Sequence, residues 1–147
     1  MTCLPDVNVW IALTIGEHIH HAAAARWFKS AANDAIAFCR VTQMSFLRLL
    51  TNNRVMAGDV LTAAQAWEML ERFRRDDRVT FLPEPLDIEG RWRKPAAPHK
   101  IGANFWTDTY LAAFSEAAEC TLITFDRRFK KHKRLRLEIL SPASRAD

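Results

Sequence analysis

The stretch FWTDTYLAAFSEAAECTLITFDRRF, residues 105–129, decides the fold class. Its first half, DTYLAAFSEAAE, is rich in Ala and predicts a helix, for which Thr107 is the expected N-cap. Its second half, CTLITFD, is a short apolar run that predicts a buried strand ending at Asp126. A helix that leads directly into a buried strand is typical of an α/β protein with a parallel sheet.

The rest of the chain repeats this alternation of strands and helices. Thr42 and Thr62 are the expected N-caps of two of the helices. Residues 83–98 are rich in proline and show no clear pattern. We therefore predict an α/β fold with a largely parallel sheet. The predicted strands are 2–6, 35–39, 78–83 and 135–140, and the predicted helices are 7–15, 22–32, 44–53 and 63–76.

Length and composition predict one soluble globular domain, residues 1–147. The 147 residues are 49% hydrophobic and 26% charged, and this length suffices for one sizeable core. No apolar run is long enough to span a bilayer, and the first residues lack the basic start of a signal peptide. Cys3, Cys39 and Cys120 are an odd number without CxxC spacing, which favours a reducing cytoplasm over a disulfide framework or a zinc site.

The charges are unevenly distributed along the chain. Residues 1–126 hold 13 Lys and Arg against 15 Asp and Glu, a net charge of −2, whereas residues 127–147 hold 8 against 2, a net charge of +6. This basic C-terminal segment, 127–147, is concentrated in RRFKKHKRLR. It predicts an anionic partner, with nucleic acid first, or else a solvated end that keeps the protein soluble.

Three aspartates stand at the ends of predicted elements. Asp6 and Asp126 directly follow strands, and Asp108 lies in the first turn of a helix. The carboxyl ends of parallel strands form the crevice in which α/β proteins bind ligands. Carboxylates that gather there need a cation, and Mg²⁺ and Mn²⁺ prefer such oxygen ligands. Each aspartate taken singly also fits a helix cap or a turn, so spacing alone does not define a metal site.

Other chemistries lack their sequence signals. The chain has no glycine-rich phosphate loop and no GxSxG nucleophile elbow. His18, His20 and His21 form a dense cluster, but no Cys stands at zinc-ligand spacing from them. We interpret the histidines as a polar lead-in to the following helix.

The segments LPDVNVWIAL, FCRVTQMSFLRLLTN and FWTDTYLAAFSEAAECTLITFDRRF, in this order, resemble a PIN domain. More narrowly, they resemble the VapC family of ribonuclease toxins from bacterial toxin–antitoxin pairs. The resemblance implies a three-layer α/β/α sandwich with a mainly parallel sheet, in which Asp6, Asp108 and Asp126 hold Mg²⁺ or Mn²⁺. It also implies an endoribonuclease that uses metal-activated water to attack an RNA backbone phosphate, a cognate antitoxin protein and a homodimer.

One position departs from the family pattern. The family has a glutamate just after the capping Thr of the helix that follows the second strand, and this chain has Gln43. Glutamine offers a carbonyl oxygen but no negative charge, and it cannot act as a base. Three explanations stay open: a natural branch that needs only three carboxylates, an engineered change that disarms a toxin, or a non-catalytic PIN domain that binds RNA.

Residues beside the aspartates complete the predicted site. Arg127, Arg128 and Lys130 follow Asp126 and are expected to bind substrate phosphates. Thr107 and Thr124 are expected to support the aspartates, by proximity alone. A nuclease that acts on DNA is a third possibility, because none of these side chains reads a 2′-hydroxyl.

Overall fold

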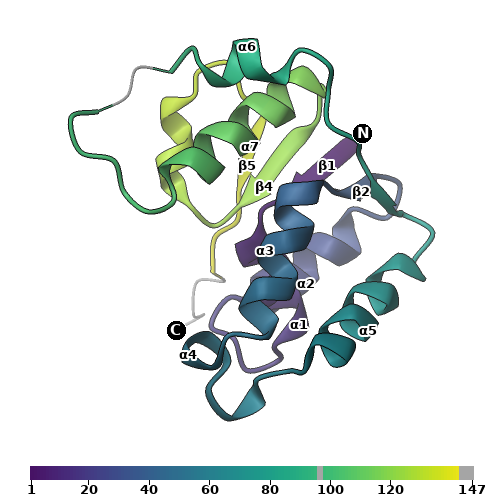
Figure 1. Ribbon diagram of the computed structural model, residues 1–147. Helices are drawn as coiled ribbons and strands as arrows, with labels where there is room; N and C mark the ends of the chain where they lie inside the picture. The colour runs from purple at the N-terminus through teal and green to yellow at the C-terminus, as the bar shows by residue number, and fades with distance from the viewer. Residues whose placement is uncertain (96–97, 143–147) are drawn as a thin grey trace, which may run out of the picture.

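The computed structural model describes residues 1–95 and 98–142 (Figure 1). In these residues, five strands form one sheet in the order β3-β2-β1-β4-β5, and every neighbouring pair is parallel. The predicted parallel α/β fold is therefore confirmed. The strands are β1 (Thr2–Pro5), β2 (Ala35–Phe38), β3 (Val79–Phe81), β4 (Thr121–Thr124) and β5 (Leu137–Ile139).

Helices cover both faces of the sheet and give a three-layer sandwich. Helices α1, α2, α3 and α5 pack on one face, and α6 and α7 pack on the other (Figure 1). Among the described residues, no helix has the length and apolar composition needed to cross a bilayer. The helices are α1 (Val7–Thr14), α2 (His21–Ser30), α3 (Arg40–Leu50), α4 (Asn53–Met56), α5 (Ala63–Arg74), α6 (Ile88–Trp92) and α7 (Phe105–Ala117), with the 3₁₀ turns η1 (Ala57–Asp59) and η2 (Arg127–Lys131).

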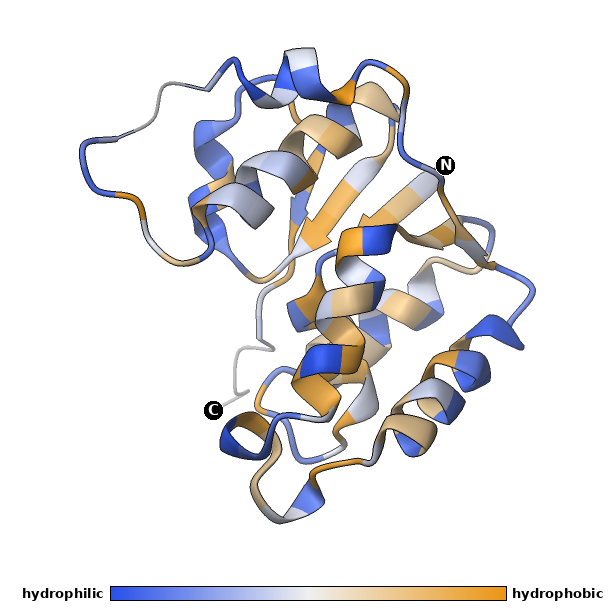
Figure 2. Ribbon diagram, in the orientation of Figure 1, coloured by the Kyte–Doolittle hydropathy of each residue, from blue (hydrophilic) through white to orange (hydrophobic). Residues whose placement is uncertain are grey.

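Successive side chains of a strand point alternately to the two faces of the sheet and pack in two separate hydrophobic cores. In β2, Ile36 and Phe38 point into the core beneath α1, α3 and α5, whereas Ala37 points into the core beneath α7. Leu122 and Ile123 of β4 divide between the two cores in the same way. Because both faces of the central strands are covered, β1, β2 and β4 are mostly apolar, and β4 is largely orange in Figure 2. The edge strands β3 and β5 each have one exposed polar residue, Thr80 and Glu138.

The core beneath α1 is organised around an aromatic cluster. The ring of Trp10 stacks on Phe38 with the centroids 3.8 Å apart, and its edge meets Phe73 at 5.0 Å. This cluster joins α1, β2 and α5, so it fixes α1 against the sheet. Since α1 begins directly after β1, the same packing holds the carboxyl end of β1 in place.

The structure corrects two of the three predicted helix caps. Thr62 caps α5 as expected, because its Oγ1 accepts from the Gln65 N–H at 3.2 Å. Thr42, in contrast, lies inside α3, which begins at Arg40, and its Oγ1 accepts from the Cys39 N–H at 3.0 Å. The residue that leaves β2 in an extended conformation thus becomes the cap, and the threonine supports it from within the helix.

Thr107 is also inside its helix. Helix α7 begins at Phe105, and the Thr107 hydroxyl donates back to the Asn104 carbonyl at 3.0 Å. The two aromatic residues before Thr107, Phe105 and Trp106, already belong to the helix. The proline-rich stretch 83–98, for which the sequence gives no clear pattern, contains the short helix α6, which buries Ile88 against α7.

Candidate active site

Asp6 stands at the carboxyl end of β1, where the strand turns into α1. Its N–H donates to the Ile123 carbonyl of β4 at 2.8 Å, which ties the turn to the neighbouring strand. Its Oδ1 accepts from the Val7 N–H at 2.7 Å, as an N-cap does. Its Oδ2 accepts from the Thr124 hydroxyl at 2.9 Å and from the Asn8 amide at 3.0 Å. The Asp6 carboxylate is therefore held in one orientation.

The charge on Asp6 is unfavourable in the protein alone. The pKa of this carboxyl is raised from 3.8 to about 6, chiefly by burial and also by the neighbouring Asp108 and Asp126. The hydrogen bonds from Thr124 and Val7 oppose this rise without cancelling it. A cation beside Asp6 would favour its ionised form, because it would offset both the burial and the repulsion from the two other carboxylates.

Asp108 reaches the same place from the opposite layer. It lies in the first turn of α7, where the helix dipole favours an anion. Its side chain is 27% exposed, and burial is the largest cause of the rise in its pKa. Asp126 raises that pKa as well, whereas Arg128 lowers it. Asp108 is thus close enough to Asp126 for the two charges to interact.

Asp126 follows β4 and caps η2. Its N–H donates to Thr124 Oγ1 at 3.0 Å, and its Oδ1 accepts from the Arg128 N–H at 2.8 Å. Thr124 is fully buried and also contacts Asp6 and Asn8. One threonine hydroxyl therefore links the two aspartates that end β1 and β4.

Arg128 places a positive charge on this acidic cluster. Its Nε lies 3.0 and 2.8 Å from the two carboxylate oxygens of Asp126, and its Nη2 lies 2.6 Å from Asp126 Oδ2. The same Nη2 lies 3.8 Å from Asp108 Oδ2. The hydrogen bond from Arg128 is the main reason that the pKa of Asp126 is lowered.

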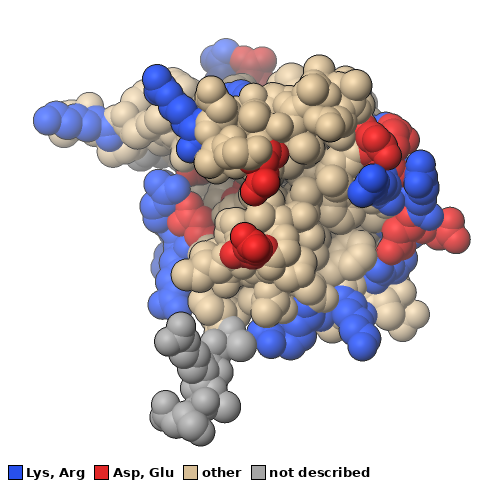
Figure 3. Space-filling model, turned by 90° about the horizontal axis from the view of Figure 1, so that it is seen from below, with Lys and Arg blue, Asp and Glu red and all other residues tan. Residues whose placement is uncertain are grey.

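The three aspartates line one hollow of about 240 Å³ at the carboxyl end of the sheet. Figure 3, which views the molecule from below, shows acidic atoms inside a hollow on this face and basic side chains along one side of it. Helix α3 forms the wall opposite α7. The other polar side chains that line the hollow are Asn8, Thr42, Ser45, Arg48, Asn104, Thr107 and Arg128.

The structure does not bring Gln43 to this hollow. Gln43 is 3% exposed, its amide oxygen accepts from Arg40, and it is not among the residues that line the hollow. The α3 residues that line the hollow include Thr42 and Ser45, which are three positions apart and share a helix face. Gln43 is turned away from Thr42 by about 100° because an α-helix has 3.6 residues per turn. The polar side chains of α3 that line the hollow with the aspartates are Thr42, Ser45 and Arg48.

The predicted basic residues also separate in the structure. Arg128 lines the hollow, whereas Arg127 and Lys130 are exposed and outside its lining. Lys131, which the sequence analysis missed, lines an adjoining hollow together with Asp108 and Arg128. The spacing of Arg128 and Lys131 in the turn η2 is the signal that would have found it.

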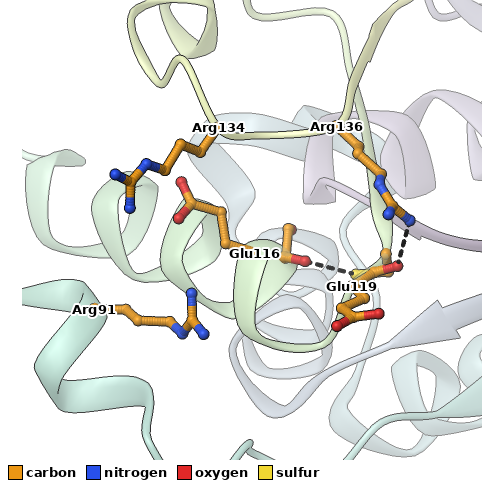
Figure 4. A pocket seen from close by; sticks show the side chains of 7 residues that line it. Arg91, Glu116, Glu119, Arg134 and Arg136 are labelled. Atoms are coloured by element: carbon orange, nitrogen blue, oxygen red, sulfur yellow. Dashed lines mark hydrogen bonds between the residues drawn. The ribbon is translucent and has the colours of Figure 1, made fainter.

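A second hollow of about 240 Å³ lies at the other end of α7 and has mixed charge (Figure 4). Arg91, Arg134 and Arg136 surround it together with Glu116 and Glu119. Arg136 donates to the Glu119 carbonyl at 3.2 Å. Cations are favoured at the C-terminus of a helix, and the two glutamates offset part of their charge. This arrangement closes the end of a helix, so the candidate chemistry lies at the first hollow.

The donor set of the first hollow fits a hard divalent cation in its chemistry. Three carboxylates supply negatively charged oxygens, and the Arg128 guanidinium already stands where a cation would be attracted. Among the described residues, no three His, Cys, Asp or Glu side chains stand close enough together to hold an ion without moving. Both oxygens of Asp126 accept hydrogen bonds from Arg128 in this structure.

A parallel α/β/α sandwich with carboxylates gathered at the ends of β1, β4 and α7 is the arrangement of a PIN domain. The PIN domain family matches residues 3–135, so the chain belongs to this family.

Within it, the chain belongs to the VapC ribonucleases, as the resemblance implied. It is 37% identical over 143 residues to ribonuclease VapC41 of Mycobacterium tuberculosis, covering 94% of this chain and 98% of that protein. It is 35% identical to ribonuclease VapC29 of the same organism, covering 86% of each.

Solved structures share the fold. VapBC2 from Rickettsia felis, bound to a DNA fragment from its promoter, matches with a TM-score of 0.69 at 17% identity and covers 96% of this chain and all of that chain. Mycobacterium tuberculosis VapC20, described as a toxin that cleaves the sarcin-ricin loop, matches with a TM-score of 0.64 at 15% identity, covering 95% of this chain and 99% of that chain.

Proposed function

We propose that this protein is a Mg²⁺- or Mn²⁺-dependent endoribonuclease toxin. The observation that carries the proposal is the hollow lined by Asp6, Asp108 and Asp126, three carboxylates delivered by separate elements to one place. Carboxylates are gathered in this way where a site handles cations and phosphates. The ribonuclease names of the VapC relatives support RNA as the substrate.

The three aspartates would hold the cation, each with a different support. Hydrogen bonds from Val7, Thr124 and Asn8 fix the Asp6 carboxylate. The negative charge of Asp108 is favoured by the helix dipole, because Asp108 lies in the first turn of α7. When bound, such a cation polarises a phosphate oxygen and lowers the pKa of a water molecule. The protein's own task is to hold the carboxylates apart from bulk water with fixed geometry, so that little reorganisation is needed during the reaction.

Basic side chains at the rim would position the RNA backbone. Arg128 and Lys131 lie beside Asp108, and Arg48 lines the hollow from α3. Each can neutralise a phosphate, which orients the chain without reading its sequence. Arg127 and Lys130 of η2 are exposed and add positive charge to the same turn, whereas Arg134 and Arg136 lie at the other end of α7. Binding is therefore expected to weaken as the salt concentration rises.

A non-catalytic RNA-binding PIN domain is the second candidate. The observation that favours it is the composition of the α3 wall, where Thr42, Ser45 and Arg48 line the hollow and no carboxylate does. Gln43, the position at which the chain departs from the family pattern, is not among the residues that line the hollow. A site with three carboxylates rather than four binds cations less strongly. This candidate predicts RNA binding that persists in EDTA without cleavage.

We further propose a cognate antitoxin, a homodimer and a cytoplasmic location. Several solved neighbours are VapBC complexes, which supports an antitoxin partner. Met44 and Trp106 are 57% and 59% exposed, and Trp92 and Tyr110 lie beside them in an apolar groove. Apolar surface of this kind is commonly covered by a protein partner. Light scattering after size-exclusion chromatography, on the protein alone and with the antitoxin, measures both assemblies.

The proposed activity is tested by incubating the purified protein with total cellular RNA in Mg²⁺ or Mn²⁺. We expect discrete cleavage products that disappear in EDTA. Asp108→Asn is the matched control, since it keeps the size of a side chain that is 27% exposed and removes its charge. Cleavage by both proteins alike would indicate a contaminating nuclease or a different site. RNA binding without cleavage in any divalent metal would favour the second candidate.

A further inference from the structure

The Arg128 guanidinium supplies a positive charge to the acidic hollow. Its guanidinium makes a forked contact with both oxygens of Asp126 and approaches Asp108 Oδ2 at 3.8 Å. These two aspartates belong to the set proposed to bind the metal. An arginine that uses both oxygens of a carboxylate leaves them poorly available to another cation.

The contact is not needed to build the fold. The Arg128 side chain is 67% exposed, and exposed ion pairs add little stability because solvent screens them. The backbone of η2 is held separately, since the Arg128 N–H donates to Asp126 Oδ1 at 2.8 Å and the Phe129 ring is buried in the core. The side chain can therefore leave Asp126 while the turn stays in place.

We propose that Arg128 competes with the divalent cation for Asp126 and Asp108, so that metal binding releases its guanidinium to the rim of the hollow. The inference rests on the proposed metal site and adds a regulation of that site. In the metal-free protein, Arg128 offsets the repulsion between the two carboxylates. Once the metal has taken over that role, the released guanidinium faces the solvent beside Asp108, where an RNA phosphate can bind it.

Competition has a consequence that can be measured without any RNA. Removing the guanidinium leaves Asp126 without its main partner and makes the hollow more negative, so the affinity for a divalent cation rises. We expect Arg128→Gln to bind Mn²⁺ about tenfold more tightly than the wild type, given a forked, partly exposed charge pair. Arg128→Lys keeps the charge but loses the fork, so its affinity is expected to lie between the two.

The matched control is Arg127→Gln, which removes the same charge from the same turn. Arg127 is exposed, and among the described residues it forms no ion pair with the three aspartates. Screening by solvent and salt should keep its effect on Mn²⁺ affinity within about twofold. Isothermal titration calorimetry with Mn²⁺ measures all four proteins, and thermal melts show whether each is folded.

The outcomes separate this inference from the proposed function. Tighter Mn²⁺ binding by Arg128→Gln, with Arg127→Gln near the wild type, supports competition. Equal affinities in all four proteins overturn the competition and leave the metal site standing. If Arg128→Gln does not fold, an Arg128→Lys affinity equal to that of the wild type overturns it in the same way. Absence of Mn²⁺ binding in every folded protein overturns both the metal site and this inference.

Discussion

Asp6→Asn is expected to stabilise the metal-free protein at neutral pH, although it removes a proposed metal ligand. Burial raises the pKa of Asp6 from 3.8 to about 6, so the folded state holds this proton more tightly than the unfolded chain does. Below about pH 3 the carboxyl is protonated in both states and costs nothing. Above about pH 7 it is ionised in both states, and a difference of this size lowers the free energy of unfolding by about 3 kcal/mol.

Asparagine removes this cost but also loses hydrogen bonds. Its carbonyl oxygen can still cap the Val7 N–H, whereas its NH₂ group cannot accept from Thr124 or Asn8 as Asp6 Oδ2 does. That loss costs about 1 kcal/mol. The net expectation at pH 7.5 is a gain of about 2 kcal/mol, which corresponds to a rise in Tm of about 6 °C for a chain of this length.

Urea unfolding in EDTA at pH 7.5 and pH 3 measures the effect. The gain should be present at pH 7.5 and should become a loss of about 1 kcal/mol at pH 3, where only the missing hydrogen bonds count. Asp77→Asn, at an exposed position, is the control and should change stability by less than about 0.5 kcal/mol at both pH values. A variant that is less stable than the wild type at pH 7.5, or a difference that does not change with pH, would refute the reasoning.

Three further predictions concern the site and the core. Thr124→Val should lower the free energy of unfolding by about 1–3 kcal/mol, since it leaves buried partners without a hydrogen bond, and it should slow RNA cleavage; urea unfolding and a gel assay measure the two effects. Gln43→Glu should leave the affinity for Mn²⁺ within about twofold, whereas Ser45→Glu should raise it, because only the second carboxylate faces the aspartates; calorimetry distinguishes them. Trp10→Ala should cost about 3–5 kcal/mol in urea unfolding, through loss of the stack on Phe38.

Much of the fold follows from local signals in the sequence. Buried strands such as β2, with the sequence AIAF, are continuous apolar runs, because both faces of a central parallel strand are covered. The aspartates could be chosen because each follows a strand or begins a helix, and such ends meet at one edge of a parallel sheet. Asp6, Asp108 and Asp126 line one hollow, as this rule predicts.

The sequence does not reveal in which direction each side chain of a helix points, or where neighbouring elements make a helix begin. Gln43 and Ser45 lie two positions apart on one helix, and the direction in which each points depends on how α3 packs against the sheet. Thr42 and Thr107 are good capping residues, but the N-cap positions are Cys39 in α3 and Asn104 in α7. The strand before α3 and the loop before α7 determine where each helix begins. The contact of Arg128 with Asp126 depends on a turn geometry that composition does not reveal.

The central claim is that three carboxylates hold a catalytic divalent cation. The most direct test is the initial rate of RNA cleavage in Mn²⁺ for Asp6→Asn, Asp108→Asn and Asp126→Asn, with Asp77→Asn as the control. The account predicts that each of the first three loses at least about 100-fold in rate, that the control cleaves like the wild type, and that EDTA abolishes cleavage. A wild-type rate in any of the three site variants, or cleavage that persists in EDTA, would contradict it.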